Sequence, residues 1–141
     1  MQPQTLINRL EAECALLKTV GGAADFAAAE QSLRNKTPAA YVVPLTETAR
    51  PNSSATLVVR QQVTQQFGVI FALSNLRDNR GEKALEDLHQ VRQQVFEKLL
   101  GWAPPGEQSL MEFGGGRLLE MDNQVVWWQD EFLIDIQLRS N

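Results

Sequence analysis

Three carboxylates near the end of the chain are the first candidates for chemistry. Asp130, Glu131 and Asp135 lie close together in the sequence. Two carboxyl groups held about 5 to 9 Å apart can cleave a glycosidic bond by acid and base catalysis. The surrounding residues predict a strand, however, and adjacent residues of a strand point to opposite faces of a sheet. Asp130 and Glu131 are therefore expected to diverge, which argues against a catalytic pair.

The only histidine, His89, and the only cysteine, Cys14, are the next candidates. A zinc site needs at least three protein ligands, and neither residue has others at a suitable spacing. His89 lies beside the apolar stripe of a predicted helix, which favours a solvated or helix-packing side chain. Cys14, near Leu10 and Leu17, fits a small buried apolar residue, and an unpaired cysteine favours a reducing compartment. We expect no catalytic residue, metal site or cofactor.

A run of three glycines, Gly114 to Gly116, is another pattern with a chemical interpretation. Glycine-rich loops bind phosphates where they lead into the N-terminus of a helix. This run matches neither G-x-G-x-x-G nor the Walker spacing, and no helix is predicted to follow it. The run therefore predicts a bulge or bend in a strand.

Length and charge favour a single soluble domain. The chain has 141 residues, 43% of them hydrophobic, and a formal net charge of −4. This size fits one domain over residues 1–141. Nucleic-acid affinity comes largely from clustered Lys and Arg, and no basic run occurs. No apolar run approaches the roughly 20 residues that span a bilayer, and no signal-peptide pattern is present. We expect a soluble protein made in the cytoplasm.

Apolar residues at three- and four-residue steps predict helices over residues 3–17, 23–33 and 82–100. Gly21 separates the first two helices, and Gly101 is expected to cap the third. The inward stripe of the third helix consists of apolar residues: Leu85, Leu88, Val91, Val95 and Leu99.

Segments rich in β-branched and aromatic residues predict the strands. They cover residues 39–45, 57–73, 110–121 and 124–138. Asp122 and Asn123 suit the turn of a hairpin between the last two, and residues 46–55 predict a flexible loop. Together the elements predict an α+β domain, with a single largely antiparallel β-sheet and helices packed on one face.

Trp127 and Trp128 are adjacent in the last predicted strand and should point to opposite faces. Trp128 shares its face with Phe132 and Ile134, whereas Trp127 shares the other face with Glu131. Either a helix of the same chain or another subunit must then cover Trp127. Aromatic residues are common both under local cover and at the centres of interfaces, so the sequence supports both possibilities equally.

The first half of the long strand at 57–73 is polar, with Arg60, Gln62 and Gln66 among its residues. A strand that projects beyond its own domain has this composition, because it offers amide and backbone groups to a neighbour or lines a wet channel. An ordinary solvent-facing edge has it too, and the composition slightly favours this second interpretation.

Several segments, taken in order and spacing, are similar to those of a known family. They are residues 17–24, 38–45, 60–69, 75–78, 100–106, 113–119 and 127–132. Through these segments the chain resembles, over nearly its whole length, the tail terminators (tail-completion proteins) of bacteriophages and prophages. The resemblance implies a structural virion protein and brings no catalytic residue with it.

The resemblance also implies a mode of action. Such proteins form a hexameric ring on the finished end of the tail tube, stop its polymerisation and present the surface to which the head docks. The partners would be other copies of the chain, the tail tube protein and the head-tail connector or neck protein. DNA would pass through the ring without specific binding, and no membrane would be involved. The protein would lie at the head-proximal end of the virion tail after assembly in the host cytoplasm.

Seven residues are candidates for contacts between subunits: Trp127, Glu131, Arg60, Gln62, Gln66, Arg77 and Asp78. A neck or head-completion protein is an alternative function of the same broad class. A small ligand-binding domain or enzyme, with a pocket under Trp102 and Pro104, is an alternative of another class. The lack of a His, Cys or Ser constellation counts against it.

Overall fold

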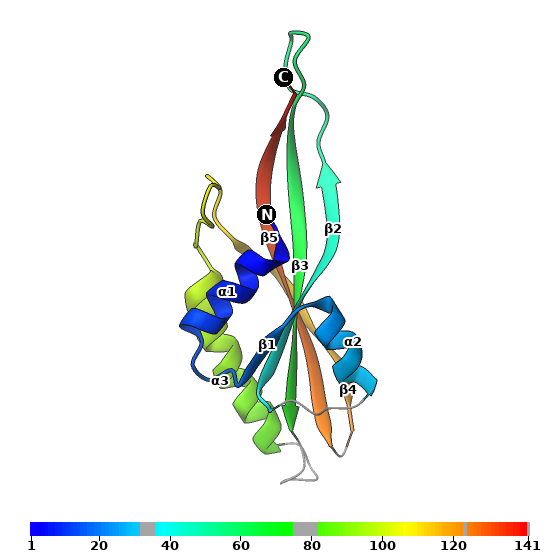
Figure 1. Ribbon diagram of the computed structural model, residues 1–141, viewed down its shortest axis with the longest axis vertical. Coiled ribbons are helices and arrows are strands. Elements are labelled where there is room, and N and C mark those ends of the chain that lie inside the picture. The colour runs from blue at the N-terminus through cyan, green and yellow to red at the C-terminus, as the bar shows by residue number, and fades with distance from the viewer. Residues whose placement is uncertain (32–35, 75–81, 123, 141) are drawn as a thin grey trace.

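The computed structural model describes residues 1–31, 36–74, 82–122 and 124–140. Within these ranges five strands form one sheet, and three helices pack on it (Figure 1). The strand order is β1-β2-β3-β5-β4. In chain order the elements are α1 (Pro3–Glu13), β1 (Thr19–Gly21), α2 (Ala23–Gln31), β2 (Ala39–Ala49), β3 (Arg60–Ser74), α3 (Glu82–Leu99), β4 (Glu112–Met121) and β5 (Val125–Arg139).

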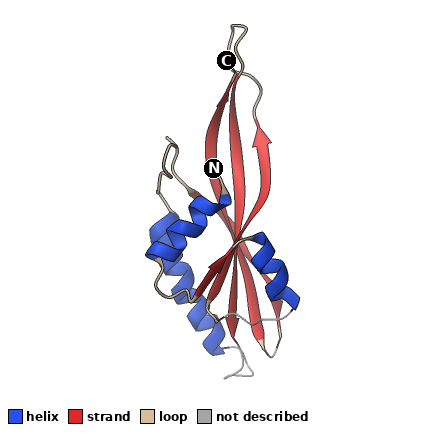
Figure 2. Cartoon of the chain, in the orientation of Figure 1, coloured by secondary structure: helices blue, strands red, loops and turns tan. Residues whose placement is uncertain are grey.

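The predicted α+β class with one largely antiparallel sheet is confirmed. β1 pairs with β2 in parallel, and the other strand pairs are antiparallel. The helices occupy both faces of the sheet, not one: α1 and α3 lie on one face and α2 on the other (Figure 2). The second face can hold a helix because Ile70 of β3 and Trp127 of β5 make it apolar where α2 packs.

The main core lies between the sheet and the helices α1 and α3. Odd-numbered residues of β3, such as Phe67 and Phe71, face it together with Leu6 and Leu10 of α1. The α3 residues buried there are Ala84, Leu88, Val91, Val95 and Leu99. Leu85, predicted to point inward, is 43% exposed. The preceding residue, Ala84, takes the inward position, and one residue along a helix turns the side chain by about 100°.

A second, smaller core lies under α2. Phe26 and Ala29 of the helix pack there with Tyr41 of β2 and Trp127 of β5. The rings of Phe26 and Trp127 meet edge to face, with centroids 5.8 Å apart and planes at 75°. This contact holds α2 against the lower part of the sheet, as Figure 1 shows.

Some element ends differ from the prediction. α1 ends at Glu13 and not at residue 17, because Cys14 has a non-helical backbone with φ −113° and ψ 82°. Cys14 and Leu17 are nevertheless buried in the main core, as predicted for Cys14. β1 was not predicted, because its three residues are too short to show a pattern. The predicted end of α2 at residue 33 lies outside the described residues.

The flexible loop predicted at residues 46–55 begins too early. β2 continues to Ala49, and its last four residues pair with β3 after a register shift between Pro44 and Thr46. At the other end, β3 begins at Arg60 and not at residue 57. The connection therefore covers residues 50–59. Asn52 orders it, because its Oδ1 accepts hydrogen bonds from the backbone N–H groups of Ser54 (3.0 Å) and Arg60 (2.8 Å).

The predicted end of α3 and the predicted hairpin are confirmed. Gly101 has φ +74°, a left-handed conformation that suits glycine after a helix. β4 and β5 pair as an antiparallel hairpin. Oδ1 of Asp122 accepts hydrogen bonds from the backbone N–H groups of Val125 (2.8 Å) and Gln124 (2.7 Å), and these bonds lower the pKa of the carboxyl group. Asn123 lies outside the described residues.

Half of the sheet extends beyond the helices, as Figure 1 shows. We call it the projecting half, and it comprises residues 44–49 of β2, 60–66 of β3 and 133–139 of β5. Within it, β3 and β5 pair in continuous register, from Arg60 opposite Arg139 to Gln66 opposite Leu133. The end of the projecting half, residues 50–59 with Arg60 and Arg139, is called the tip below.

Candidate assembly interface

Five of the seven candidate contact residues share one face of the sheet. Arg60, Gln62 and Gln66 are even-numbered residues of β3, and the even-numbered Ile70 and Ala72 of that strand lie in the core under α2. Because the pairing of β3 with β5 is uninterrupted, the three polar residues face the same side. Trp127 and Glu131 of β5 stand opposite Ala72 and Gly68 and share this face. The other two candidates, Arg77 and Asp78, lie outside the described residues.

Hydrogen bonds between side chains organise the polar part of this face. Nε2 of Gln66 donates to Oε2 of Glu131, and Oγ1 of Thr46 donates to Oε1 of Gln66 at 2.9 Å. Nε2 of Gln129 donates to the second oxygen of Glu131 at 3.2 Å. The side chains of Gln66, Gln129 and Glu131 therefore hold one another in place and form an ordered polar network across β3 and β5.

The tip carries positive charge from three arginines. Arg60 of β3 and Arg139 of β5 are directly opposite each other, and Arg50 follows the end of β2. Within the described part of the chain these three arginines form no ion pair. Like charges directly opposite in a sheet destabilise it. The arrangement therefore favours an external anionic partner at the tip.

Trp127 is covered by a helix of its own chain, which decides between the two possibilities that the sequence supported. It is only 8% exposed and packs against Phe26 of α2. The interpretation in which no helix of its own chain covers Trp127 is therefore wrong, whereas a contact of Trp127 with another subunit stays a prediction. The prediction that Trp127 and Trp128 lie on opposite faces is confirmed, because Trp128 packs against the main core.

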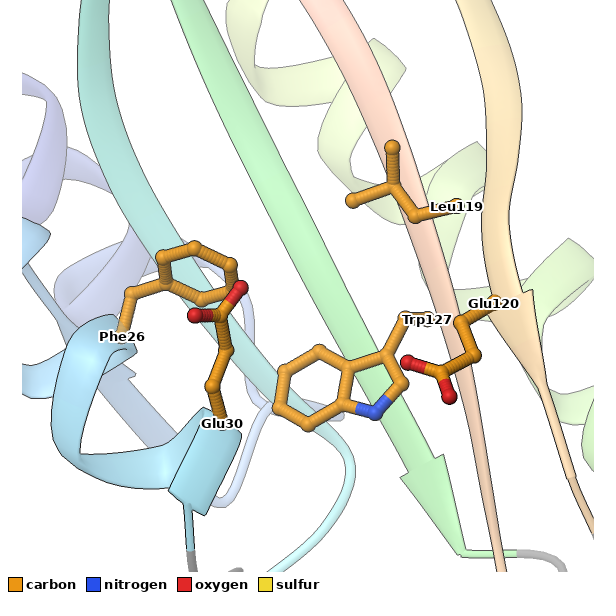
Figure 3. A pocket seen from close by; sticks show the side chains of 5 residues that line it. All are labelled: Phe26, Glu30, Leu119, Glu120 and Trp127. Atoms are coloured by element: carbon orange, nitrogen blue, oxygen red, sulfur yellow. The ribbon is translucent and has the colours of Figure 1, made fainter.

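The exposed edge of Trp127 forms the floor of a groove between α2 and β4 (Figure 3). The groove has a volume of about 480 Å³ and is lined by Phe26, Glu30, Leu119, Glu120 and Trp127. The carboxylates of Glu30 and Glu120 stand on either side of the indole in Figure 3. Sequence reasoning missed this groove, because α2 and β4 are distant in the chain and meet only through the order of the strands.

The edge strand β4 adds apolar surface that sequence reasoning also missed. Its side chains Phe113, Leu118, Leu119 and Met121 are exposed. β4 pairs only with β5 among the described strands, so its outer edge has unpaired backbone groups. Exposed apolar residues on a free strand edge are typical of a surface that another chain covers. The apolar run in the sequence indicated a strand but not that it lies at the edge.

The predicted divergence of Asp130 and Glu131 is confirmed. Asp130 points to the α3 side and is 0% exposed. Arg92 of α3 binds both its oxygens, from Nε to Oδ2 and from Nη2 to Oδ1, each at 2.9 Å. Nε1 of Trp128 also donates to Oδ1, at 2.8 Å. Both oxygens of Asp130 thus accept hydrogen bonds from Arg92, which hold α3 to the sheet, and Glu131 lies on the opposite face.

The bulge predicted at the glycine run is confirmed. The register of β4 with β5 shifts between Phe113 and Gly115, and Gly115 has φ +140°, which is open to glycine and disfavours other residues. Gly116 leaves space for the carboxylate of Asp130. The run therefore shapes the edge strand.

The remaining reactive residues do not converge on one another. His89 is exposed on α3. Cys14 is buried, and this burial raises the pKa of its thiol to about 11. Among the described residues, no three His, Cys, Asp or Glu side chains gather as a metal site would require. In the same part of the chain, no helix has both the length and the apolar character needed to cross a membrane.

Comparison with known proteins provides independent information. The family model described as "Phage tail terminator protein" matches residues 1–141, the whole of the chain. A search of curated proteins found no significant match.

Proposed function

The chain belongs to the phage tail terminator family, and we propose that it caps the phage tail tube as a ring. Membership of the family makes it a structural component of the phage tail. In the proposed role, the ring sits on the finished end of the tube, ends its polymerisation and provides the surface to which the filled head docks. The ring is expected to be a hexamer, assembled in the host cytoplasm and retained at the head-proximal end of the tail.

The observation that carries this proposal is the position of two unlike surfaces on one chain, each with the character of a contact surface. The cationic tip stands at the end of the projecting half, whereas α2 and β4 lie on the helix-covered half (Figure 1). Residues of α2 and β4 line the groove. A ring needs head-to-tail contacts in which one surface of a subunit meets a different surface of the next. A chain with two unlike contact surfaces meets this requirement.

The charge of the chain fits a ring through which DNA must pass. Proteins grip DNA by neutralising phosphates with clustered Lys and Arg. The formal net charge of −4 and the lack of basic runs in the sequence work against such a grip. The three tip arginines are the exception, and an anionic protein surface is their expected partner.

Electron microscopy of tail tubes tests the proposal. Purified tube protein from the same phage is polymerised with and without this chain, and tube lengths are measured. The proposed role predicts shorter tubes, each with a ring on one end. Unchanged tubes without bound rings would contradict it. Binding to filled heads that lack tails, without binding to tubes, would instead identify a neck protein.

A further inference from the structure

The groove has the chemistry of a site for a cationic side chain. Glu30 and Glu120 are exposed at its two sides, and neither forms an ion pair within the described residues. Trp127 forms the floor and Phe26 part of the wall (Figure 3). Aromatic rings with carboxylates beside them attract Arg and Lys through both cation–π and charge–charge contacts.

Among the described residues, no cation lines the groove. Among the β4 residues that pair with β5 on this face, Arg117 is the nearest basic one. It stands opposite Gln129, which is two residues from Trp127 along β5 and shares its face. Arg117 forms no ion pair in the part of the chain that the structure describes. In addition, the indole Nε1 of Trp127 donates no hydrogen bond to any described residue. Within the described part of the chain, the groove therefore has acceptors without an ion-pair partner, an indole donor without an acceptor and an apolar floor.

The tip has the complementary character. Leu57 at its end is 104% exposed, so it contacts essentially nothing in its own chain. Arg60 and Arg139 stand opposite each other just below. The tip thus presents an apolar side chain beside two arginines that form no ion pair within the described residues.

The tip is also held in a defined shape. The backbone N–H of Ser140 donates to the carbonyl of Val59 at 2.9 Å, and Oγ of Ser140 accepts from the N–H of Val59 at 2.8 Å. The N–H of Ser53 donates to the carbonyl of Arg60 at 2.9 Å. A pre-organised element loses less conformational entropy on binding, so the tip is suited to insertion into a site.

We propose that the groove receives the tip of a second copy of this chain. Leu57 of one copy packs against Trp127 and Leu119 of the next, and Arg60 and Arg139 pair with Glu30 and Glu120. The proposal rests on the ring described above and identifies one of its contacts between subunits. Opposite charges favour this contact, whereas tip against tip or groove against groove would bring like charges together.

Charge reversal tests the contact. The tip variant carries Arg60→Glu and Arg139→Glu, the groove variant carries Glu30→Lys and Glu120→Lys, and the combined variant carries all four changes. Because the reversals cancel, the combined variant keeps the net charge of the natural chain. Sedimentation velocity over a range of concentrations measures assembly, and circular dichroism confirms that each variant folds. The substituted side chains are all exposed.

We expect the tip variant and the groove variant each to raise the concentration of half-assembly at least about tenfold, and the combined variant to restore it. Matched controls change the net charge equally on other exposed residues. They are Lys18→Glu with Lys36→Glu, and Glu11→Lys with Glu97→Lys. Both controls should assemble like the natural chain.

The outcomes separate the contact from the proposed function. If the natural chain forms rings but the combined variant assembles no better than the tip variant, the proposed contact is wrong and the proposed ring is still supported. Full assembly of both the tip and groove variants also overturns the contact. A natural chain that stops at a dimer, with rescue in the combined variant, keeps the contact and contradicts the ring. A natural chain that stays monomeric, alone and with tubes, contradicts both.

Discussion

Gly116 of β4 stands directly opposite Asp130 of β5, and a side chain at Gly116 would collide with Oδ1 of that carboxylate. The indole of Trp128 closes the same space, with its Nε1 3.1 Å from the position of the missing Cβ. Asp130 can therefore be buried with Arg92 beneath an edge strand only because residue 116 has no side chain.

Gly116→Ala should destabilise the fold by about 1 to 3 kcal/mol, the usual cost of forcing extra atoms into a packed site. Alanine has a higher strand propensity than glycine, so a loss of stability would point to the collision. Urea denaturation measures the effect. Arg117→Ala, at the adjacent exposed residue, is the control and should change stability by less than about 0.5 kcal/mol. A Gly116→Ala variant as stable as the natural chain would rule out the collision.

Asp130→Ala should cost about 3 kcal/mol, because it leaves the guanidinium of Arg92 without its buried partner. The comparison is Asp87→Ala, which removes an exposed ion pair with Lys83 at 3.1 Å. That variant should lose at most about 0.5 kcal/mol. Thermal or urea unfolding of both variants provides the measurement. Equal losses would mean that the Arg92–Asp130 pair contributes no more than a surface pair.

Trp127→Ala and Trp128→Ala should both weaken the fold, since each indole packs against a core. Loss of Trp127 leaves a cavity beside Phe26 and should cost about 3 to 5 kcal/mol. Loss of Trp128 also removes the hydrogen bond to Asp130, with a cost of about 2 to 4 kcal/mol. Leu57→Ala, at the fully exposed tip, is the control for stability. An unchanged unfolding midpoint for Trp127→Ala would mean that α2 does not depend on this contact.

Cys14 should make stability depend on pH in the alkaline range. Burial raises the pKa of its thiol from the ordinary 9.0 to about 11. The unfolded chain thus loses this proton at lower pH than the folded chain, and the contribution of Cys14 is fully present below pH 9 and is lost as the pH rises towards about 11. Unfolding free energies of the natural chain and of Cys14→Ala, compared across this range, isolate the effect. Parallel curves for the two proteins would contradict it.

Alternation made much of this fold predictable from the sequence. It assigned Trp127 and Trp128 to opposite faces of the sheet, and likewise Asp130 and Glu131. It also placed Gln62 and Gln66 on the same face. These conclusions hold because side chains in a strand alternate whatever the neighbouring strands are. The cap at Gly101 was predictable for a similar reason, since it depends on local backbone geometry.

The arrangement of distant segments was not predictable from the same patterns. The groove depends on α2 and β4 lying on either side of Trp127, and the tip depends on Arg60 pairing with Arg139. Both follow from strand order and register, which the local patterns of a single sequence do not reveal. The polar composition of residues 46–49 suggested a loop, yet pairing with β3 satisfies their backbone and makes them strand.

The length of tails in a lysate tests the proposed role most directly. The gene for this chain is deleted from the phage or prophage that encodes it, and tails are measured by electron microscopy, with the gene supplied from a plasmid as the control. A cap that ends polymerisation predicts tubes of uncontrolled, greater length without attached heads, and normal joined particles in the control. Tails of natural length that are joined to heads in the absence of the chain would contradict the role.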